Sequence, residues 1–389
     1  MVKPGYKQTE IGVIPEDWEV KPLKVVAPLQ RGFDLPYSSI KDGIYPVVFS
    51  NGIGAYHSSY MVKGPGVVMG RSGTIGKIHY VKSDYWPHNT TLWVTDFHNN
   101  DPLFASYLFK TIPWNLYNSG SGVPTLNRND VQDYLVAIPS PKEQTEIAAI
   151  LSDVDTLINS LKRQIVKKKA IKQGAMQELL TGKKRLPGFS GDWIKSNIGS
   201  CIIEKPSYGI NAPAVDFNGF LPRYIRITDI SKDGRYCKDA QASVSAENVE
   251  PFLLKTNDIV LARTGASVGK SYIYDEHDGR LVYAGFLIKM SIDPQKADSR
   301  FIFGVLHTYD YWKWVAQTSM RSGQPGINGE EYASYEFRMP SDLKEQKAIA
   351  DILTNMDNEI VTLGKKLIKY RQVKQGMMQQ LLTGKIRLV

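Results

Sequence analysis

The 389-residue sequence has little cysteine and no long apolar run. Its two cysteines, Cys201 and Cys237, are too few for a disulfide framework or a structural zinc site. No stretch of about 18 residues is apolar without a charge, and the N-terminus lacks the apolar core of a signal peptide. We therefore expect a cytoplasmic protein with no membrane partner.

Recognisable catalytic motifs are also missing. The six histidines show no metal-ligand spacing, and there is no Gly-x-Ser-x-Gly elbow to raise a serine nucleophile. The segment from Gly265 to Lys270 resembles a phosphate-binding loop, but three residues separate its glycines where that loop needs four. Asp34-Leu35-Pro36-Tyr37 differs at its second position from the Asp-Pro-Pro-Tyr tetrapeptide of amino-methyltransferases, and no glycine-rich turn for a methyl donor accompanies it. We expect no catalytic residue, metal site or cofactor site in this chain.

What the sequence does have is an excess of basic residues. Lys and Arg number 48 against 39 Asp and Glu, for a net charge of +9. Such a balance favours polyanionic partners such as nucleic acid, although the signal is weak on its own. The hydrophobic share of 42% is typical of folded proteins, and the length predicts two or three folded parts.

The clearest feature is an internal repeat. Residues 143–186 return without a gap as residues 345–388, with roughly half the positions identical and a shared ending KQG-x-MQ-x-LLTGK-x-RL. Fainter repeats precede each copy: Asp17-Trp18 with Asp192-Trp193, residues 67–77 with 259–270, and SGVPTLN (121–127) with SGQPGIN (322–328). The order along the chain is therefore globular part, helix, globular part, helix.

Each long copy is predicted to be one helix. Ser140, Pro141 and Glu143 form a capping-box pattern at the first start, and Gly182 provides a left-handed stop. Asp342, Glu345 and Gly384 take the same places in the second copy. Apolar residues in alternating steps of four and three predict a coiled-coil seam, the alternative being that each helix packs only on its own domain. The seam residues are Ile147, Leu151, Val154, Ile158, Leu161 and Ile165 in the first helix and Ile349, Leu353, Met356, Ile360, Leu363 and Leu367 in the second.

The two helices are expected to pair antiparallel within one chain. About 40 residues of helix span about 60 Å, and a parallel pair would require the second globular part to bridge that length. An antiparallel pair brings starts and ends together, and the entropy of closing the intervening loop grows only logarithmically with its length. A pseudo-twofold relation between the two globular parts follows.

The predicted fold class is mixed α/β, with two globular domains built on twisted β-sheets, each followed by a long helix. Short β-branched and aromatic runs such as YPVVFS, GVVMGR, DIVLAR and GFLIKMSI alternate with glycine turns. Further helices are expected to start at Asp101-Pro102 and Asp298-Ser299. The predicted boundaries are 1–139, helix 140–182, linker 183–192, 193–340, helix 341–384 and tail 385–389.

Basic residues beside glycines are the candidates for DNA contact. Arg71 and Lys77 flank glycines in the first globular part, and Arg263 and Lys270 do so in the second, where the backbone could approach a phosphate chain closely. A simple solvated turn is nearly as good an interpretation. Arg128, Arg226 and Arg321 are further candidates. The basic run 163–172 and its twin (Lys365, Lys366, Lys369, Arg371) could be either a solvated helix face or a source of phosphate contacts.

Taken together, these motifs resemble the specificity (S) subunit of Type I restriction-modification systems. The resemblance covers nearly the whole chain: an opening like YKQTEIGVIPEDWEV, a recognition domain, and a helix that begins PxxEQ and ends KQGxMQxLLTGKxRL, then both again. It implies that each domain reads one half of a split, asymmetric double-stranded DNA site, while the helices hold the domains apart and bind two adenine-N6 methyltransferase (M) subunits. Restriction (R) subunits join the assembly, and S-adenosylmethionine, ATP and magnesium are used by those partners.

Two other classes of function compete with this interpretation. A coiled-coil scaffold could recruit partner proteins without reading DNA. A fused nuclease or methyltransferase is disfavoured because its motifs are missing.

Overall fold

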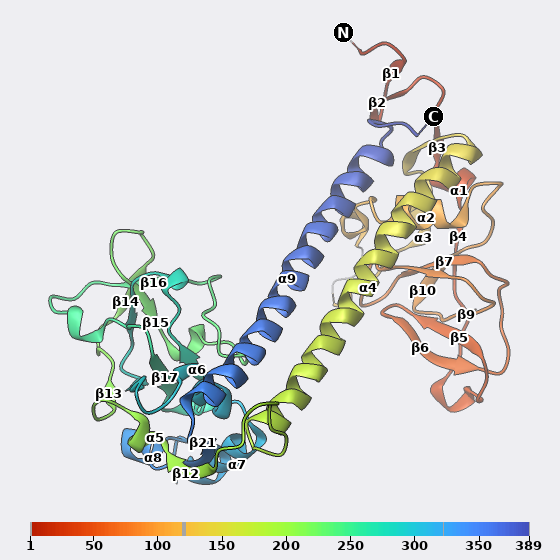
Figure 1. Ribbon diagram of the computed structural model, residues 1–389. Coiled ribbons are helices and arrows are strands. Elements are labelled where there is room, and N and C mark those ends of the chain that lie inside the picture. Colours follow the sequence, from red (N-terminus) through yellow and green to blue (C-terminus); the bar gives the residue numbers. More distant parts are fainter. Residues whose placement is uncertain (1, 119–121, 322, 389) are drawn as a thin grey trace. The chain divides into compact units, whose positions relative to one another are not determined.

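The computed structural model describes residues 2–118, 122–321 and 323–388 (Figure 1). The chain forms two compact units: unit 1 is residues 1–163 with 365–389, and unit 2 is residues 164–364. This division cuts both long helices, α4 (Pro141–Leu179) and α9 (Leu343–Leu381), each of 39 residues. Each unit therefore contains one globular part and one half of each long helix. Ser121 and Ser322, which open the repeated SG segments, lie outside the described residues.

Unit 1 is built on a four-stranded antiparallel sheet in the order β4-β10-β7-β8. A three-stranded sheet (β6-β5-β9) and the pairs β1-β2 and β3-β11 complete it. The strands are β1 (Tyr6–Thr9), β2 (Gly12–Pro15), β3 (Glu19–Pro22), β4 (Leu29–Arg31), β5 (Tyr45–Phe49), β6 (Gly52–His57), β7 (Gly66–Gly70), β8 (Ile78–Val81), β9 (Trp86–Pro87), β10 (Thr91–Val94) and β11 (Leu135–Ile138). The short helices are α1 (Leu23–Val26), α2 (Pro102–Phe109) and α3 (Arg128–Val131).

Unit 2 repeats this plan with a four-stranded antiparallel sheet in the order β13-β20-β17-β18. A second sheet runs β14-β16-β15-β19, and β12 pairs with β21. The strands are β12 (Trp193–Asn197), β13 (Ser207–Tyr208), β14 (Ala214–Asp216), β15 (Arg223–Ile225), β16 (Ala242–Val244), β17 (Asp258–Ala262), β18 (Ser271–Ile273), β19 (Leu281–Tyr283), β20 (Leu287–Ser291) and β21 (Glu336–Pro340). The short helices are α5 (Ile198–Cys201), α6 (Ser299–Val305), α7 (Tyr309–Thr318) and α8 (Gly329–Ala333).

The registers of the two four-stranded sheets are equivalent residue by residue. In unit 1, Leu92 lies between Arg31 and Met69. In unit 2, Ile288 occupies the same place between Tyr208 and Leu261. The mixed α/β fold with two sheet-based domains, each followed by a long helix, is confirmed.

The helices expected at Asp101 and Asp298 are present. The carboxylate of Asp101 accepts a hydrogen bond from the Phe104 amide, and that of Asp298 accepts from the Arg300 and Phe301 amides. Helix α7 was not predicted, because its aromatic segment YDYWKWVAQT also suits a strand. Tyr311 and Val315, four residues apart on one face, are buried, so packing selects the helix.

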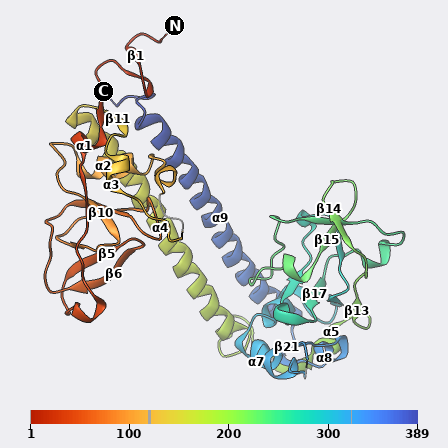
Figure 2. The ribbon, with the colours of Figure 1, turned by 180° about the vertical axis from the view of Figure 1, so that it is seen from behind.

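Within each unit, the first half of one long helix pairs with the second half of the other, which is an antiparallel pairing (Figure 2). In unit 1, Lys374 Nζ lies 2.7 Å from Asp155 Oδ1, and in unit 2, Lys172 Nζ lies 2.6 Å from Asp357 Oδ2. Six of the predicted seam residues are buried and the other six are half-buried. At the helix starts, the seam also belongs to the domain core, because Ile147 packs in one cluster with Trp18 and Leu381. At that end, the apolar stripe therefore packs on both the other helix and the domain core.

The ends of the two long helices agree with the sequence prediction only in part. Gly182 and Gly384 have the positive φ of left-handed stops, +72° and +68°. The capping box is wrong as far as the glutamates are concerned: the Glu143 amide reaches Ser140 Oγ at 3.4 Å, but its carboxylate points to Arg387 and Trp18 instead of back to the cap. A buried carboxylate gains more from a guanidinium than from a neutral amide, and Glu143 is 0% exposed.

Candidate nucleic-acid interface

The candidate interface of unit 1 is the loop that follows β7. The amide of Arg71 donates to the Thr90 carbonyl at 3.0 Å, and its own carbonyl accepts from the Leu126 amide at 2.9 Å. The Gly73 amide donates to the Pro124 carbonyl at 3.0 Å. Arg71 is thus held just after the end of β7, between the start of β10 and the repeated Pro-containing segment.

The loop after β17 has the same frame in unit 2. The amide of Arg263 donates to the Phe286 carbonyl at 3.0 Å, and its carbonyl accepts from the Ile327 amide at 2.9 Å. The Gly265 amide donates to the Pro325 carbonyl at 3.0 Å. The weak sequence repeats around Arg71 and Arg263 therefore correspond to two loops with the same backbone hydrogen bonds.

A tight turn closes each loop and requires glycine. Gly76 and Gly269 have φ of +73° and +86°, and their amides donate to the carbonyls of Gly70 and Ala262, at 3.1 Å in both cases. A Cβ on Gly76 would lie 2.7 Å from the Trp114 side chain. These glycines therefore serve the turn and its packing.

The two predicted lysines are tied to neighbouring loops. Lys77 Nζ donates to the Asn51 carbonyl at 2.6 Å, and Lys270 Nζ donates to the Ile230 carbonyl at 3.2 Å. Residues Gly265–Ser267 form a 3-10 turn. The phosphate-loop interpretation therefore gains no support from the structure, since the lysine is directed to a protein carbonyl.

The side chains beside the two arginines differ. In unit 1, the guanidinium of Arg71 forms no hydrogen bond or ion pair with any described residue, and burial followed by repulsion from Arg31 lowers its pKa. In unit 2, the guanidinium of Arg263 lies over the ring of Tyr208, 4.8 Å from its centroid. Arg31 and Tyr208 occupy equivalent positions in the two sheets.

Exposed aromatic side chains accompany the loops. In unit 1, Tyr37 is 72% exposed and stacks on Phe49 at 5.6 Å, while Phe49 contacts His88 at 4.4 Å. In unit 2, Phe286 is 60% exposed beside Arg263. Aromatic and basic groups together suit contact with bases and backbone.

The other predicted arginines differ in how many hydrogen bonds and ion pairs their side chains already form. Arg128 is exposed at the first turn of α3 and pairs with no described residue. Arg226 donates from Nε and Nη2 to Asp229 at 2.8 and 2.9 Å. Arg321 is bound to Glu331 and to the Thr318 carbonyl. Arg128 is therefore the freest donor of these three.

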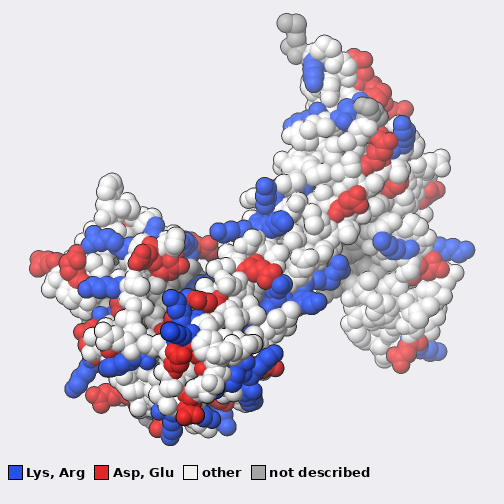
Figure 3. Space-filling model, viewed as in Figure 1, with Lys and Arg blue, Asp and Glu red and all other residues white. Residues whose placement is uncertain are grey.

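The basic run on α4 is largely neutralised in unit 2. Lys168 pairs with Glu359 at 2.7 Å, and Lys172 pairs with Asp357 at 2.6 Å. On the face seen in Figure 3, basic and acidic side chains intermingle over unit 2, whereas the β-strand part of unit 1 is largely uncharged there. The basic run 163–172 on α4 is therefore a weaker source of phosphate contacts than the Arg71 and Arg263 loops.

Arg31, Tyr208 and Phe286 were not predicted from the sequence, and Tyr37 was considered only as part of the tetrapeptide at Asp34. Strand register reveals that Arg31 and Tyr208 occupy equivalent positions. The sequence interpretation also missed the role of the Glu-Gln pair at each helix start, although the verbatim repeat of EQ was a usable signal.

Each Glu-Gln pair fastens a helix start to its unit. Glu143 accepts from Arg387 Nε at 2.6 Å, and Asp17 accepts from Arg387 Nη1 at 2.8 Å. In unit 2, Glu345 accepts from Arg185 Nε at 2.6 Å. The arginine of each LLTGKxRL ending thus binds the glutamate that starts the other helix.

The glutamines hold the caps of the short helices. Gln144 Oε1 accepts from the Asp101 amide at 2.9 Å, and Gln346 Oε1 accepts from the Asp298 amide at 3.0 Å. Gln144 Nε2 also donates to the Pro139 carbonyl at 3.0 Å.

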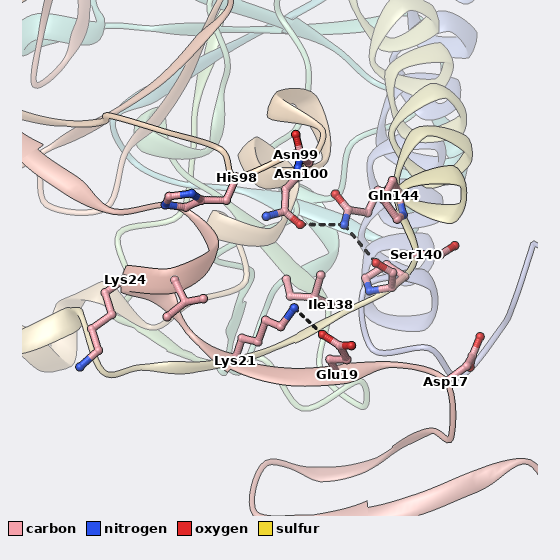
Figure 4. A pocket seen from close by; sticks show the side chains of 13 residues that line it. Asp17, Glu19, Lys21, Lys24, His98, Asn99, Asn100, Ile138, Ser140 and Gln144 are labelled. Atoms are coloured by element: carbon pink, nitrogen blue, oxygen red, sulfur yellow. Dashed lines mark hydrogen bonds and ion pairs between the residues drawn. The ribbon is translucent and has the colours of Figure 1, made fainter.

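A hollow of about 710 Å³ lies in unit 1 beside the start of α4 (Figure 4). Its wall includes Glu19 paired with Lys21, and Gln144 bonded to Asn100. Asp17 and Lys24, which also line the hollow, pair with Arg387 and Asp133 outside it. Among the described residues, no group of three or more His, Cys, Asp or Glu is placed to hold a metal ion, and no helix is both long and apolar enough to cross a membrane.

Comparison with known proteins identifies the family. The family described as "Type I restriction modification DNA specificity domain" matches residues 15–171 and 192–370. The putative type I restriction enzyme MjaX specificity subunit of Methanocaldococcus jannaschii is 26% identical over 436 residues, covering 99% of this chain and 97% of that protein.

Two solved structures share the fold. The S subunit of a Type I restriction-modification system from M. genitalium has a TM-score of 0.67 at 14% identity, covering 97% of this chain and 98% of that one. A chain from a study of complex assembly and conformational transition of the type I R-M system has a TM-score of 0.53 at 15% identity, covering 96% of this chain and 99% of that one. This chain belongs to the Type I restriction-modification DNA specificity family, and its role is DNA sequence recognition.

Proposed function

We propose that each unit reads one half of an asymmetric, bipartite DNA site. The observation that carries this proposal is the twofold construction of the interface, in which the Arg71 and Arg263 loops share one backbone frame but have different side-chain neighbours. Two loops with the same backbone frame are suited to contact two half-sites in the same way. Because the side chains beside the two arginines differ, the two half-sites are expected to differ in base sequence.

We further propose that the long helices set the gap between the half-sites and dock two methyltransferase subunits, with restriction subunits joining the assembly. S-adenosylmethionine, ATP and magnesium would then act in those partners, and this chain would contribute no catalytic group. The family membership and the likeness to a chain from a study of complex assembly support this arrangement. We expect the complex to operate in the cytoplasm.

Methylome sequencing tests the proposal. The full chain is expressed with its methyltransferase partner, and N6-methyladenine is mapped genome-wide. We expect one asymmetric motif with two short specified tracts and an unread gap, and footprinting should protect both tracts. A coiled-coil scaffold that does not read DNA predicts no motif and no protected tracts.

A further inference from the structure

We propose that Arg31 and Arg71 form one phosphate-binding pair in unit 1, and that Tyr208 at the equivalent position makes Arg263 a base-edge reader in unit 2. This inference rests on the proposed function and assigns different DNA groups to the two loops. It introduces Arg31 and Tyr208 as residues that determine what each loop contacts.

The geometry begins with the strand register. Arg31 lies opposite Leu92, which lies opposite Met69, and Arg71 follows Met69 by two residues, just after the end of β7. The Gly32 amide donates to the Thr91 carbonyl, and the Arg71 amide donates to the Thr90 carbonyl. The two arginines therefore flank the start of β10 from its two neighbouring strands.

Unit 2 shows that side chains at these two positions meet. Tyr208 lies opposite Ile288, which lies opposite Leu261, and Arg263 follows Leu261 by two residues. There the ring and the guanidinium are in contact, at 4.8 Å. The same diagonal in unit 1 is occupied by two arginines, and repulsion from Arg31 contributes, after burial, to the lowered pKa of Arg71.

Two neighbouring cations favour a full negative charge between them. The carboxylate available to Arg31 is Asp34, at 3.7 Å, and it is 76% exposed and also accepts from Asn89. This ion pair is exposed to solvent, so Asp34 neutralises Arg31 only weakly. A DNA phosphate carries the needed charge and accepts bidentate hydrogen bonds, whereas a guanine edge offers only neutral acceptors.

The Tyr208 ring has the opposite effect on Arg263. It stabilises a single cation, covers one face of the guanidinium and leaves the in-plane N–H donors free of any described partner. The in-plane N–H groups of Arg263, oriented by the Tyr208 ring, can donate two hydrogen bonds to O6 and N7 of a guanine in the major groove.

The test measures the salt dependence of DNA binding by the full chain with its methyltransferase partner. On a duplex of unrelated sequence, the slope of log K against log salt falls by about 0.9 for each phosphate that a variant no longer neutralises. We expect R31A, R71A and the double variant all to lower the slope by about one, because they share one phosphate. R31K, which keeps the charge, should retain the wild-type slope.

Reciprocal exchange makes the test sharper. R31Y should lower the slope by about one, and Y208R should raise it by about one, because Y208R builds the same pair in unit 2. R263A should keep the slope on unrelated DNA while weakening binding to the methylated motif about tenfold or more. R280A, which removes an exposed arginine paired with Glu250, is the matched control and should change neither measurement.

An unchanged slope in R31A, or a slope lowered by about two in the double variant, overturns the shared phosphate. An R263A variant that weakens binding equally on all DNA overturns the base-edge assignment. These outcomes are separate from failure of the proposed function, which would show as a wild-type complex that methylates no bipartite motif.

Discussion

Arg387 illustrates how one residue near the end of the chain stabilises a residue at its beginning. Its guanidinium binds Glu143 and Asp17, and the side-chain hydrogen bonds from these carboxylates raise its pKa above the ordinary arginine value. The ring of Trp18 lies 5.9 Å from the same guanidinium, and its Nε1 donates to Glu143 at 3.0 Å.

Arg387→Met should destabilise the protein by about 3 to 5 kcal/mol in urea unfolding at pH 7, because it leaves the fully buried Glu143 carboxylate without its cation. R387M/E143Q should recover part of the lost stability, because it removes the buried charge together with its partner. Arg280→Met is the exposed control, with an expected change below about 1 kcal/mol. Equal destabilisation in both variants would contradict the buried-pair account.

His307 gives unit 2 a dependence on pH. Burial lowers its pKa, although its Nδ1 hydrogen bond to the Phe303 carbonyl, at 2.9 Å, acts in the opposite direction. Lys172 also lowers the pKa, while Asp357 and Asp233 raise it.

Because the folded pKa of His307 lies below its unfolded value near 6.5, the unfolded state binds more protons as the pH falls through 6.5, and stability decreases. His307→Gln should reduce the decrease in unfolding free energy between pH 7.5 and pH 5.5 by up to about 1 kcal/mol. His79 and His88, whose pKa values are also lowered by burial, remain in both proteins, so the difference isolates His307. Identical pH profiles would refute this assignment.

Among the secondary-structure elements, the two long helices run without a break across the boundary between the compact units. The boundary between the units falls after Arg163 in α4 and after Gly364 in α9. The contacts described within each unit therefore lie on one side of this boundary, and helix length can be changed there without disturbing them.

Inserting seven residues after Arg163 and seven after Gly364 keeps the heptad phase and adds about 10 Å of helix. We expect the gap in the methylated motif to grow by about three base pairs, while both half-sites stay the same. Methylome sequencing measures both properties. Altered half-sites with the original gap would show that the helices do not set the spacing.

Across the molecule as a whole, the two copies of the repeat share an ion pair at equivalent positions. Asp155 with Lys374 in unit 1 has the twin Asp357 with Lys172 in unit 2. A first half on its own thus contains both partners of this ion pair, Asp155 and Lys172.

Truncation after Pro187 should therefore yield an antiparallel homodimer, with Asp155 of each copy facing Lys172 of the other. The ion pair between Lys168 and Glu359 would be missing, since the twin of Glu359 is Leu157. Light scattering should show a dimer, and with methyltransferase supplied the modified site should become an inverted repeat of the first half-site.

Charge reversal provides the control for the truncated protein. D155K alone should weaken the dimer, and D155K/K172D should restore it. A fragment that stays monomeric at high concentration would contradict a self-complementary seam.

The repeat, the two long helices, the order of the parts and the family could all be predicted from the sequence alone. These features depend on short-range sequence patterns. The patterns are the four-three spacing from Ile147 to Ile165, the glycine stops at Gly182 and Gly384, and the nearly verbatim LLTGKxRL endings. Arg71 and Arg263 also stood out, because each lies within two residues of a glycine in a repeated segment.

Which side chains meet depends on the tertiary structure. Arg31 and Arg71 are 40 positions apart, and Glu143 and Arg387 are 244 apart, so no local pattern relates them. Strand register places Arg31 beside Arg71 in one unit and Tyr208 beside Arg263 in the other. The guanidinium of Arg387 likewise draws Glu143 away from its expected helix cap, because a desolvated carboxylate is stabilised most by a nearby opposite charge.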